Sequence, residues 1–285
     1  MSQQSENVTP DNCTHDCSTC GANCASRDPA SLLEKTAAGT NIKHVIAVMS
    51  GKGGVGKSMV SSEIAIGLRE KGFSVGILDA DITGPSIPKA FGVHINDISV
   101  QNELLVPAVS EGGIKLMSLN LLIDDESSPV AWRGPIIAGT VKQFWTDVMW
   151  GELDYLVIDM PPGTGDVPLT VFQSIPVDGI VVVTSPQELV GLIVEKAVRL
   201  AGSMQKKILG IVENMSYVVC PHCGEVLRIF GESHVEEIAD RYGLEVLGQI
   251  PMDGSLAAAV DRGAVEKLST TYFEGLVDRI TELMP

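Results

Sequence analysis

A glycine-rich stretch near residue 50 constrains the fold of this chain more than any other feature of the sequence. It occupies residues 51–58, reads GKGGVGKS, and satisfies the pattern G-x-x-x-x-G-K-[ST]. An apolar run at residues 45–49 precedes it, and residues 57–71 carry apolar side chains at helical spacing. The sequence therefore predicts a strand, a tight loop and a helix in succession, which is the context in which this pattern binds phosphate.

Each residue type in the loop suits the binding of a nucleoside triphosphate, and a chance glycine turn is the alternative. Glycines allow successive backbone N–H groups to turn toward phosphate oxygens at the start of a helix. The lysine would reach the β- and γ-phosphates, and the serine hydroxyl would bind Mg²⁺, so we predict ATP and Mg²⁺ as cofactors. The predicted binding residues are Gly51, Gly53, Gly54, Val55, Gly56, Lys57 and Ser58.

Three aspartates follow apolar runs and are candidates for Mg²⁺ binding and for catalysis. Asp159 ends the run at residues 155–158 and is the expected Mg²⁺ carboxylate. Asp79 and Asp81 follow another apolar run and could serve Mg²⁺ and the attacking water, although Asp79 fits a turn cap equally well. The loop after Asp159 contains Gly163, whose amide could sense the γ-phosphate, with an ordinary strand-to-helix turn as the alternative.

The remaining pattern predicts a doubly wound, mostly parallel α/β sheet with helices on both faces. Further apolar runs occur at residues 74–78, 114–119, 155–158, 179–184, 208–213 and 245–250, and helix-length segments include residues 135–149 and 187–204. We predict a flexible, cysteine-rich tail over residues 1–40 and one ATPase domain over residues 41–285. Within that domain, residues 92–128 read as a less regular insertion to which the sequence assigns no role.

A second motif, C-x-x-C followed by glycine, lies at residues 220–224. Cys220 and Cys223 could aim two thiolates at one metal, which is half of a tetrahedral site. A two-fold axis beside this turn would bring four cysteines together around a [4Fe-4S] cluster or Zn²⁺. A zinc knuckle within one chain and a thiol–disulfide pair are the alternatives.

Four more cysteines crowd the predicted tail, at Cys13, Cys17, Cys20 and Cys24. Together they could complete a Cys₄ site within one chain, because metal binding itself can order a mobile segment. This spacing does not distinguish an iron–sulfur cluster from zinc, so both stay open.

Charge and composition exclude several classes of partner. The formal net charge is −16, which should repel nucleic acid and anionic lipid. No stretch is apolar for the roughly 18 residues that a membrane span needs, and the polar start lacks the apolar core of a secretory signal. Residues 271–284 carry apolar side chains at helical spacing and a net negative charge, which fits an amphipathic helix packed on the core better than one bound to a membrane. We therefore expect a cytoplasmic protein whose thiols are reduced.

The extra lysine of the loop, Lys52, resembles the deviant loop of the MinD/ParA/Mrp class of dimeric P-loop ATPases. Within that class, residues 79–86, 132–135, 159–166 and 214–216, together with the C-x-x-C pair, resemble the Mrp/ApbC type of iron–sulfur cluster carrier. The resemblance covers residues 44–285. It implies a homodimer in which Lys52 reaches the partner's nucleotide, Asp81 positions the attacking water and Asn214 binds adenine.

The same resemblance implies cluster scaffold or donor proteins and apo iron–sulfur clients as partners, with neither nucleic acid nor membrane. Eukaryotic members also carry four N-terminal cysteines, but at a different spacing from this chain. Two alternatives belong to other functional classes. One is a MinD/ParA-like positioning ATPase, and the other is an electron-transfer ATPase like the nitrogenase iron protein, with zinc or a permanent cluster at the C-x-x-C pair.

Overall fold

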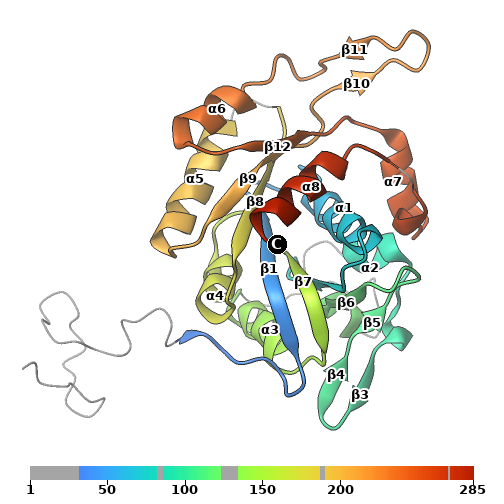
Figure 1. Cartoon of the computed structure of the whole chain (residues 1–285), viewed down its shortest axis with the longest axis vertical. Coiled ribbons are helices and arrows are strands. Elements are labelled where there is room, and N and C mark those ends of the chain that lie inside the picture. The colour runs from blue at the N-terminus through green and yellow to red at the C-terminus, as the bar shows by residue number, and fades with distance from the viewer. Residues whose placement is uncertain (1–31, 82–85, 123–133, 187–189, 269) are drawn as a thin grey trace, which may run out of the picture.

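An eight-stranded sheet forms the centre of the molecule, with helices packed on both of its faces (Figure 1). The computed structural model describes residues 32–81, 86–122, 134–186, 190–268 and 270–285. The strands of this sheet are β1 (Asn41–Ser50), β2 (Val75–Asp79), β5 (Ala108–Val109), β6 (Lys115–Ser118), β7 (Glu152–Asp159), β8 (Gly179–Thr184), β9 (Ile208–Glu213) and β12 (Val246–Gln249). They lie in the order β12-β9-β8-β1-β7-β2-β6-β5, and every neighbouring pair is parallel except β5 with β6.

Alternate residues of each central strand face opposite sides of the sheet and enter two separate cores. In β1, for example, Val45 and Ala47 belong to one core, whereas Ile46 and Val48 belong to the other. The first core is covered by α3 (Gly134–Thr146), α4 (Asp166–Ser174), α5 (Val190–Ser203) and α6 (Val235–Tyr242). The second is covered by α1 (Lys57–Glu70), α2 (Ser86–Phe91), α7 (Gly254–Asp261) and α8 (Glu274–Leu283). This arrangement confirms the predicted doubly wound fold.

The strand order brings the carboxyl ends of β1, β7 and β2 side by side. β1 pairs with β7 on one side and with β8 on the other, although the chain reaches β2 first. Asp159 at the end of β7 is in register with Asp79 at the end of β2 and with Val48 of β1. Loops that are far apart in the sequence therefore meet at one edge of the sheet, where α/β proteins bind their ligands.

The stretch expected to be an irregular insertion contributes more to the fold than the sequence suggested. It contains the short helix η4 (Ile95–Asp97), a hairpin of β3 (Ser99–Gln101) and β4 (Leu104–Val106), and the short helix η5 (Leu119–Leu122). Its strands β5 and β6 extend the main sheet, and antiparallel β5 forms its edge. The pairing of β6 with β2 also places Ser118, which belongs to none of the sequence motifs, beside Asp79.

The last residues of the predicted tail lie against α3 and α4. The backbone N–H of Glu34 donates to the carbonyl of Ser174 at 2.9 Å, and Trp145 Nε1 donates to the Glu34 carbonyl at 2.9 Å. Lys142 pairs with the Glu34 carboxylate at 2.5 Å. The domain boundary near residue 40 stays a prediction. The four tail cysteines, and residues 82–85 and 132–133 of the resemblance, lie outside the described residues.

At the other end of the chain, α8 packs into the second core through Leu276, Val277 and Ile280, which are almost completely buried. Packing on the core therefore accounts for the apolar side chains at helical spacing in residues 271–284. In the part of the chain that the structure describes, no helix has both the length and the apolar character required to cross a membrane.

Candidate nucleotide site and cysteine hairpin

The glycine-rich loop connects β1 to α1 and depends on left-handed backbone at two positions. Gly54 has a φ of 79° and Gly56, which precedes the first turn of α1, has a φ of 76°. A side chain at Gly56 would also meet the neighbouring strand end, because a Cβ there would lie 2.2 Å from Asn214 Nδ2. Glycine is therefore required at position 56 both by conformation and by space.

A cavity of about 290 Å³ opens beside this loop at the start of α1. Its lining includes Asp81 and all predicted phosphate-binding residues except Gly51. The first backbone N–H groups of a helix have no partner within the helix, and its dipole favours negative charge there. The cavity thus has the geometry and the electrostatic character of a phosphate site.

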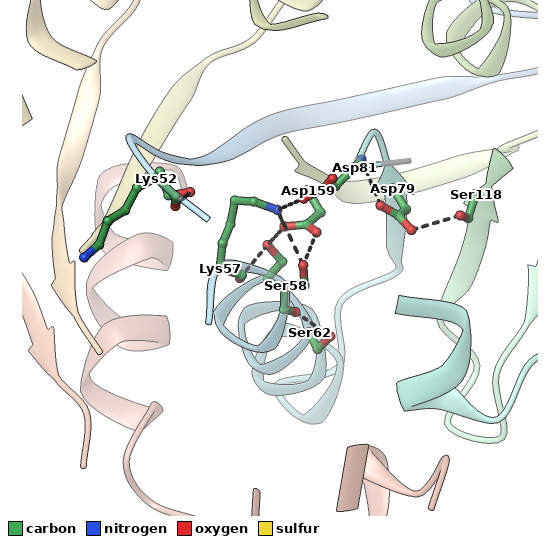
Figure 2. Close-up of polar contacts among 10 residues, drawn as sticks. Lys52, Lys57, Ser58, Ser62, Asp79, Asp81, Ser118 and Asp159 are labelled. Atoms are coloured by element: carbon green, nitrogen blue, oxygen red, sulfur yellow. Dashed lines mark hydrogen bonds and ion pairs between the residues drawn. The ribbon is translucent and has the colours of Figure 1, made fainter. Parts of the chain in front are cut away.

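Lys57 lies at the centre of a buried ionic cluster in this cavity (Figure 2). Its Nζ is 2.8 Å from Asp159 Oδ1 and 3.4 Å from Asp81 Oδ2. The Lys57 side chain is 5% exposed and that of Asp159 is fully buried. Burial alone would lower the pKa of Lys57, but the Asp159 and Asp81 carboxylates outweigh it and raise the pKa above its usual value. Lys57 therefore remains cationic.

Two serines of α1 share the Asp159 carboxylate with this lysine. Ser58 Oγ donates to Asp159 Oδ2 at 2.6 Å, and Ser61 Oγ donates to Oδ1 at 2.7 Å. The hydroxyl of Ser58 and the carboxylate of Asp159 are the oxygen ligands that Mg²⁺ prefers, so this pair fits the ion. Sequence reasoning missed Ser61. Its signal was its position one turn after Ser58, on the face of α1 that packs on the sheet.

Asp79 and Asp81 take different positions although they are two residues apart. Asp79 is 1% exposed, accepts a hydrogen bond from Ser118 Oγ at 2.9 Å, and accepts another from the Asp81 backbone N–H at 3.0 Å. Burial, and then the nearby Asp159 charge, raises the pKa of Asp79 well above its usual value. Asp79 thus holds the turn, whereas Asp81 lines the cavity.

Two other predicted residues lie beside the loop, and a third, Lys52, belongs to it. Gly163 donates its N–H to the Ser50 carbonyl at 2.8 Å, which places the segment after β7 next to the loop. Asn214 Nδ2 donates to the Val55 carbonyl at 2.9 Å, and its buried Oδ1 has no hydrogen-bond partner among the residues that the structure describes. That acceptor fits a donor group on a ligand, such as the amino group of a base. Lys52 points away from the carboxylate cluster (Figure 2).

The C-x-x-C pair lies on a hairpin of β10 (Val218–Val219) and β11 (Val226–Leu227) that projects from the body of the molecule (Figure 1). Cys220 and Cys223 are free thiols, the first partly exposed and the second exposed. Gly224 has a φ of 74° and donates its N–H to the Cys220 carbonyl at 2.9 Å, which closes the turn.

Backbone N–H groups of Cys223 and then His222 point at the Cys220 sulfur, and together with the Cys223 side chain they lower the pKa of the Cys220 thiol. A lowered pKa favours the thiolate that binds metal. Within the described ranges, no group of three or more His, Cys, Asp or Glu side chains could hold a metal ion, so the described part of the chain brings only these two thiols to the hairpin site.

The sheet topology, the loop at the start of α1 and the Asp159 carboxylate together define a P-loop NTPase. A family model described as "ParA: NUBPL iron-transfer P-loop NTPase" matches residues 41–283. The chain belongs to this family. Membership confirms the fold, the ATPase class and the family resemblance that the sequence indicated.

Similar proteins agree with this family. The chain is 44% identical over 280 residues to the iron-sulfur cluster carrier protein of Methanocaldococcus jannaschii, covering 95% of this chain and 97% of that protein. A nucleotide-binding protein from Archaeoglobus fulgidus, solved with ADP and cobalt, has a TM-score of 0.74 at 46% identity, covering 82% of this chain and 91% of that one. The MinC:MinD complex of Aquifex aeolicus, with a TM-score of 0.59 at 22% identity and coverage of 85% and 95%, shares the fold.

Proposed function

We propose that this chain is an ATP-hydrolysing iron–sulfur cluster carrier that holds a [4Fe-4S] cluster between two copies of itself and transfers it to apo-proteins. The observation that carries the proposal is the pair of free thiols, Cys220 and Cys223, on a projecting hairpin of an iron-transfer P-loop NTPase. Relatives that match most of the chain are named iron-sulfur cluster carrier proteins, which supports the same role here.

In this proposal the loop N–H groups bind the phosphates of ATP, and Lys57 exchanges Asp159 for the β- and γ-phosphates. Ser58 and Asp159 would hold Mg²⁺, which supplies charge neutralisation at the phosphates when bound. Asp81, which lines the cavity, positions the attacking water. Asn214 Oδ1 accepts a hydrogen bond from the adenine amino group, and the Gly163 amide senses the γ-phosphate by exchanging the Ser50 carbonyl for a phosphate oxygen.

In this proposal, two-fold symmetry adds a second pair of thiols to the two that the cysteine hairpin carries. Two thiolates from each of two copies make the four that a [4Fe-4S] cluster requires. Lys52 points away from the carboxylate cluster of its own chain, as a residue that reaches the partner's nucleotide should. We therefore propose a homodimer whose clients are apo iron–sulfur proteins and whose cluster comes from a scaffold or donor protein. The reducing cytoplasm would keep these thiols available.

The predicted tail cysteines would provide a separate Cys₄ site for an iron–sulfur cluster or zinc. Two cysteine variants separate the two sites. One carries Cys220→Ser with Cys223→Ser, and the other replaces all four tail cysteines by serine.

The test is anaerobic purification of the wild type and both variants, with iron, acid-labile sulfide and zinc measured per chain. We expect loss of Cys220 and Cys223 to remove about two iron and two sulfide per chain, half of a shared [4Fe-4S] cluster, and to leave nucleotide binding intact. An acceptor apo-protein should then gain its cluster only from the loaded wild type.

Two outcomes contradict the proposal. Zinc without sulfide, even after cluster reconstitution, would leave a zinc-containing ATPase. A cluster that changes redox state during ATP turnover without leaving the protein would instead indicate an electron-transfer ATPase.

A further inference from the structure

A buried carboxylate that the nucleotide site does not use lies at the end of β9. Glu213 is completely buried and is surrounded by three neutral donors. Ser216 Oγ lies 2.7 Å from its Oε2, Ser233 Oγ lies 2.9 Å from its Oε1, and Gln249 Nε2 lies 3.1 Å from Oε2. Gln249 Nε2 is also 3.1 Å from Ser233 Oγ, so the four side chains form one closed hydrogen-bonded cluster.

The cluster joins the two ends of the cysteine hairpin. Ser216 immediately precedes, and Ser233 immediately follows, residues 217–232, which contain β10, β11 and both cysteines. Each oxygen of the Glu213 carboxylate therefore accepts a hydrogen bond from a different end of the same hairpin. Because the hairpin projects from the body, its direction depends on how these two ends are held.

The next residue along the chain touches the glycine-rich loop. Asn214 donates through Nδ2 to the Val55 carbonyl at 2.9 Å, and its backbone N–H donates to the Thr184 carbonyl at 2.8 Å. Met215 then turns the chain in a left-handed conformation, with a φ of 59°. Asn214, Met215 and Ser216 thus lead directly from the loop to the start of the hairpin.

We propose that Glu213 is a positioning residue that couples nucleotide binding at the loop to the arrangement of the Cys220–Cys223 hairpin. The inference rests on the proposed function, in which Asn214 contacts the nucleotide and the cysteines hold the cluster. A nucleotide that engages Asn214 Oδ1 changes the interactions of the residue adjoining Glu213. In this proposal the Ser216 and Ser233 hydroxyls either remain on the carboxylate or leave it, and the hairpin takes a different position in each case.

The experiment measures the two thiols directly in the full-length, metal-free protein. Alkylation of Cys220 and Cys223 by N-ethylmaleimide is followed by peptide-resolved mass spectrometry, with and without Mg²⁺-ADP, while light scattering in the same samples reports the oligomeric state. In the wild type we expect ADP to change the alkylation rate by about fivefold or more, the lower range of allosteric couplings. This readout requires no iron, so it is independent of whether the chain carries a cluster.

Glu213→Gln preserves shape but places an amide N–H₂ among three donors, and Glu225→Gln makes the same change at an exposed site on the hairpin. We expect Glu213→Gln to bind fluorescent ADP with unchanged affinity and to lose the ADP-dependent change in alkylation. Glu225→Gln should retain that change. Ser233→Ala frees one end of the hairpin and keeps the carboxylate, so it should reduce the ADP-dependent change in alkylation. This variant replaces Glu213→Gln as the test if Glu213→Gln does not fold.

The inference is overturned if ADP does not affect the thiols of the wild type, if both Glu213→Gln and Ser233→Ala respond as the wild type does, or if each loses ADP binding. Failure of the proposed function would look different. It would leave the coupling intact and show no cluster in the metal analysis.

Discussion

Lys57 Nζ and Asp159 Oδ1 lie 2.8 Å apart, although the two residues are 102 positions apart in the sequence. The pair is almost completely buried, and the serine hydroxyls at positions 58 and 61 saturate the carboxylate. The carboxylate keeps Lys57 charged inside the protein. In the proposed mechanism Lys57 moves to the phosphates and Asp159 to Mg²⁺ when ATP and Mg²⁺ bind. The ion pair therefore neutralises the two side chains only in the absence of these ligands.

Breaking this pair from one side should destabilise the protein. Lys57→Met leaves the Asp159 charge with hydroxyl donors alone, and we expect a loss of about 3 kcal/mol in the free energy of unfolding, as for other buried pairs. Lys57→Met with Asp159→Asn should recover part of that loss, because no uncompensated carboxylate remains. Urea unfolding of both single variants and the double variant forms the cycle. Strictly additive effects would show that the two side chains do not interact.

Gly56→Ala and Gly54→Ala form a matched pair of loop variants. Both positions have a left-handed φ, so each alanine should cost about 1 kcal/mol of backbone strain. At Gly56 the new Cβ would also meet a neighbour, Asn214 Nδ2, whereas at Gly54 no atom of the described residues lies within 4 Å. We expect Gly56→Ala to weaken ADP binding by more than about tenfold through the displaced Asn214, and to destabilise the protein more than Gly54→Ala does. If the two variants have equal effects on ADP affinity in titration calorimetry and on thermal unfolding, the contact with Asn214 does not contribute.

Glu63 on α1 should make the stability of the protein depend on pH. Its side chain is 4% exposed, and burial, followed by the nearby Glu70 charge, raises its pKa to about 7 from 4.5. A folded-state pKa above the unfolded value means that the folded protein holds a proton that the unfolded chain releases. The buried carboxyl group therefore does not lower the free energy of unfolding below about pH 4.5. The loss of stability grows as pH rises toward 7 and is complete above it, at about 3 kcal/mol.

Glu63→Gln removes this titration. We expect the variant to be more stable than the wild type above pH 7 and to lose the decline in unfolding free energy between about pH 5 and pH 8. Glu274→Gln, at an exposed position beside the same part of α1, is the control and should keep the slope of the wild type. A wild type whose stability does not change across this range would refute the assignment.

Asp81→Asn tests whether Asp81 has a catalytic role that Asp79, which holds the turn, does not share. The substitution retains the size of the side chain, keeps the Lys57–Asp159 pair and removes the carboxylate that lines the cavity. If Asp81 positions the attacking water, kcat for ATP hydrolysis should fall by about 10²-fold with little change in ADP affinity. Steady-state kinetics and ADP titration are the measurements. An unchanged kcat would show that a group other than Asp81 positions the attacking water.

Several features of the site were predictable because their causes are local. The left-handed glycines, the apolar strand before them and the apolar periodicity after them lie within a few turns of one another, and Asp159 simply ends its own strand. The hairpin turn at Cys220 and Cys223 follows from its glycine in the same way. Such signals require no knowledge of which segments meet.

What the sequence alone determined was the strand–loop–helix unit, the alternation of strands and helices, and the spacing of Cys220 and Cys223. The tertiary structure decided which groups meet: Ser61 on Asp159, Ser118 on Asp79, and Glu213 between the two ends of the hairpin. These contacts depend on the order of the strands, in which β7 lies between β1 and β2 although it is later in the chain. The sequence pattern specifies that each strand is buried, but only packing of the whole sheet selects its neighbours.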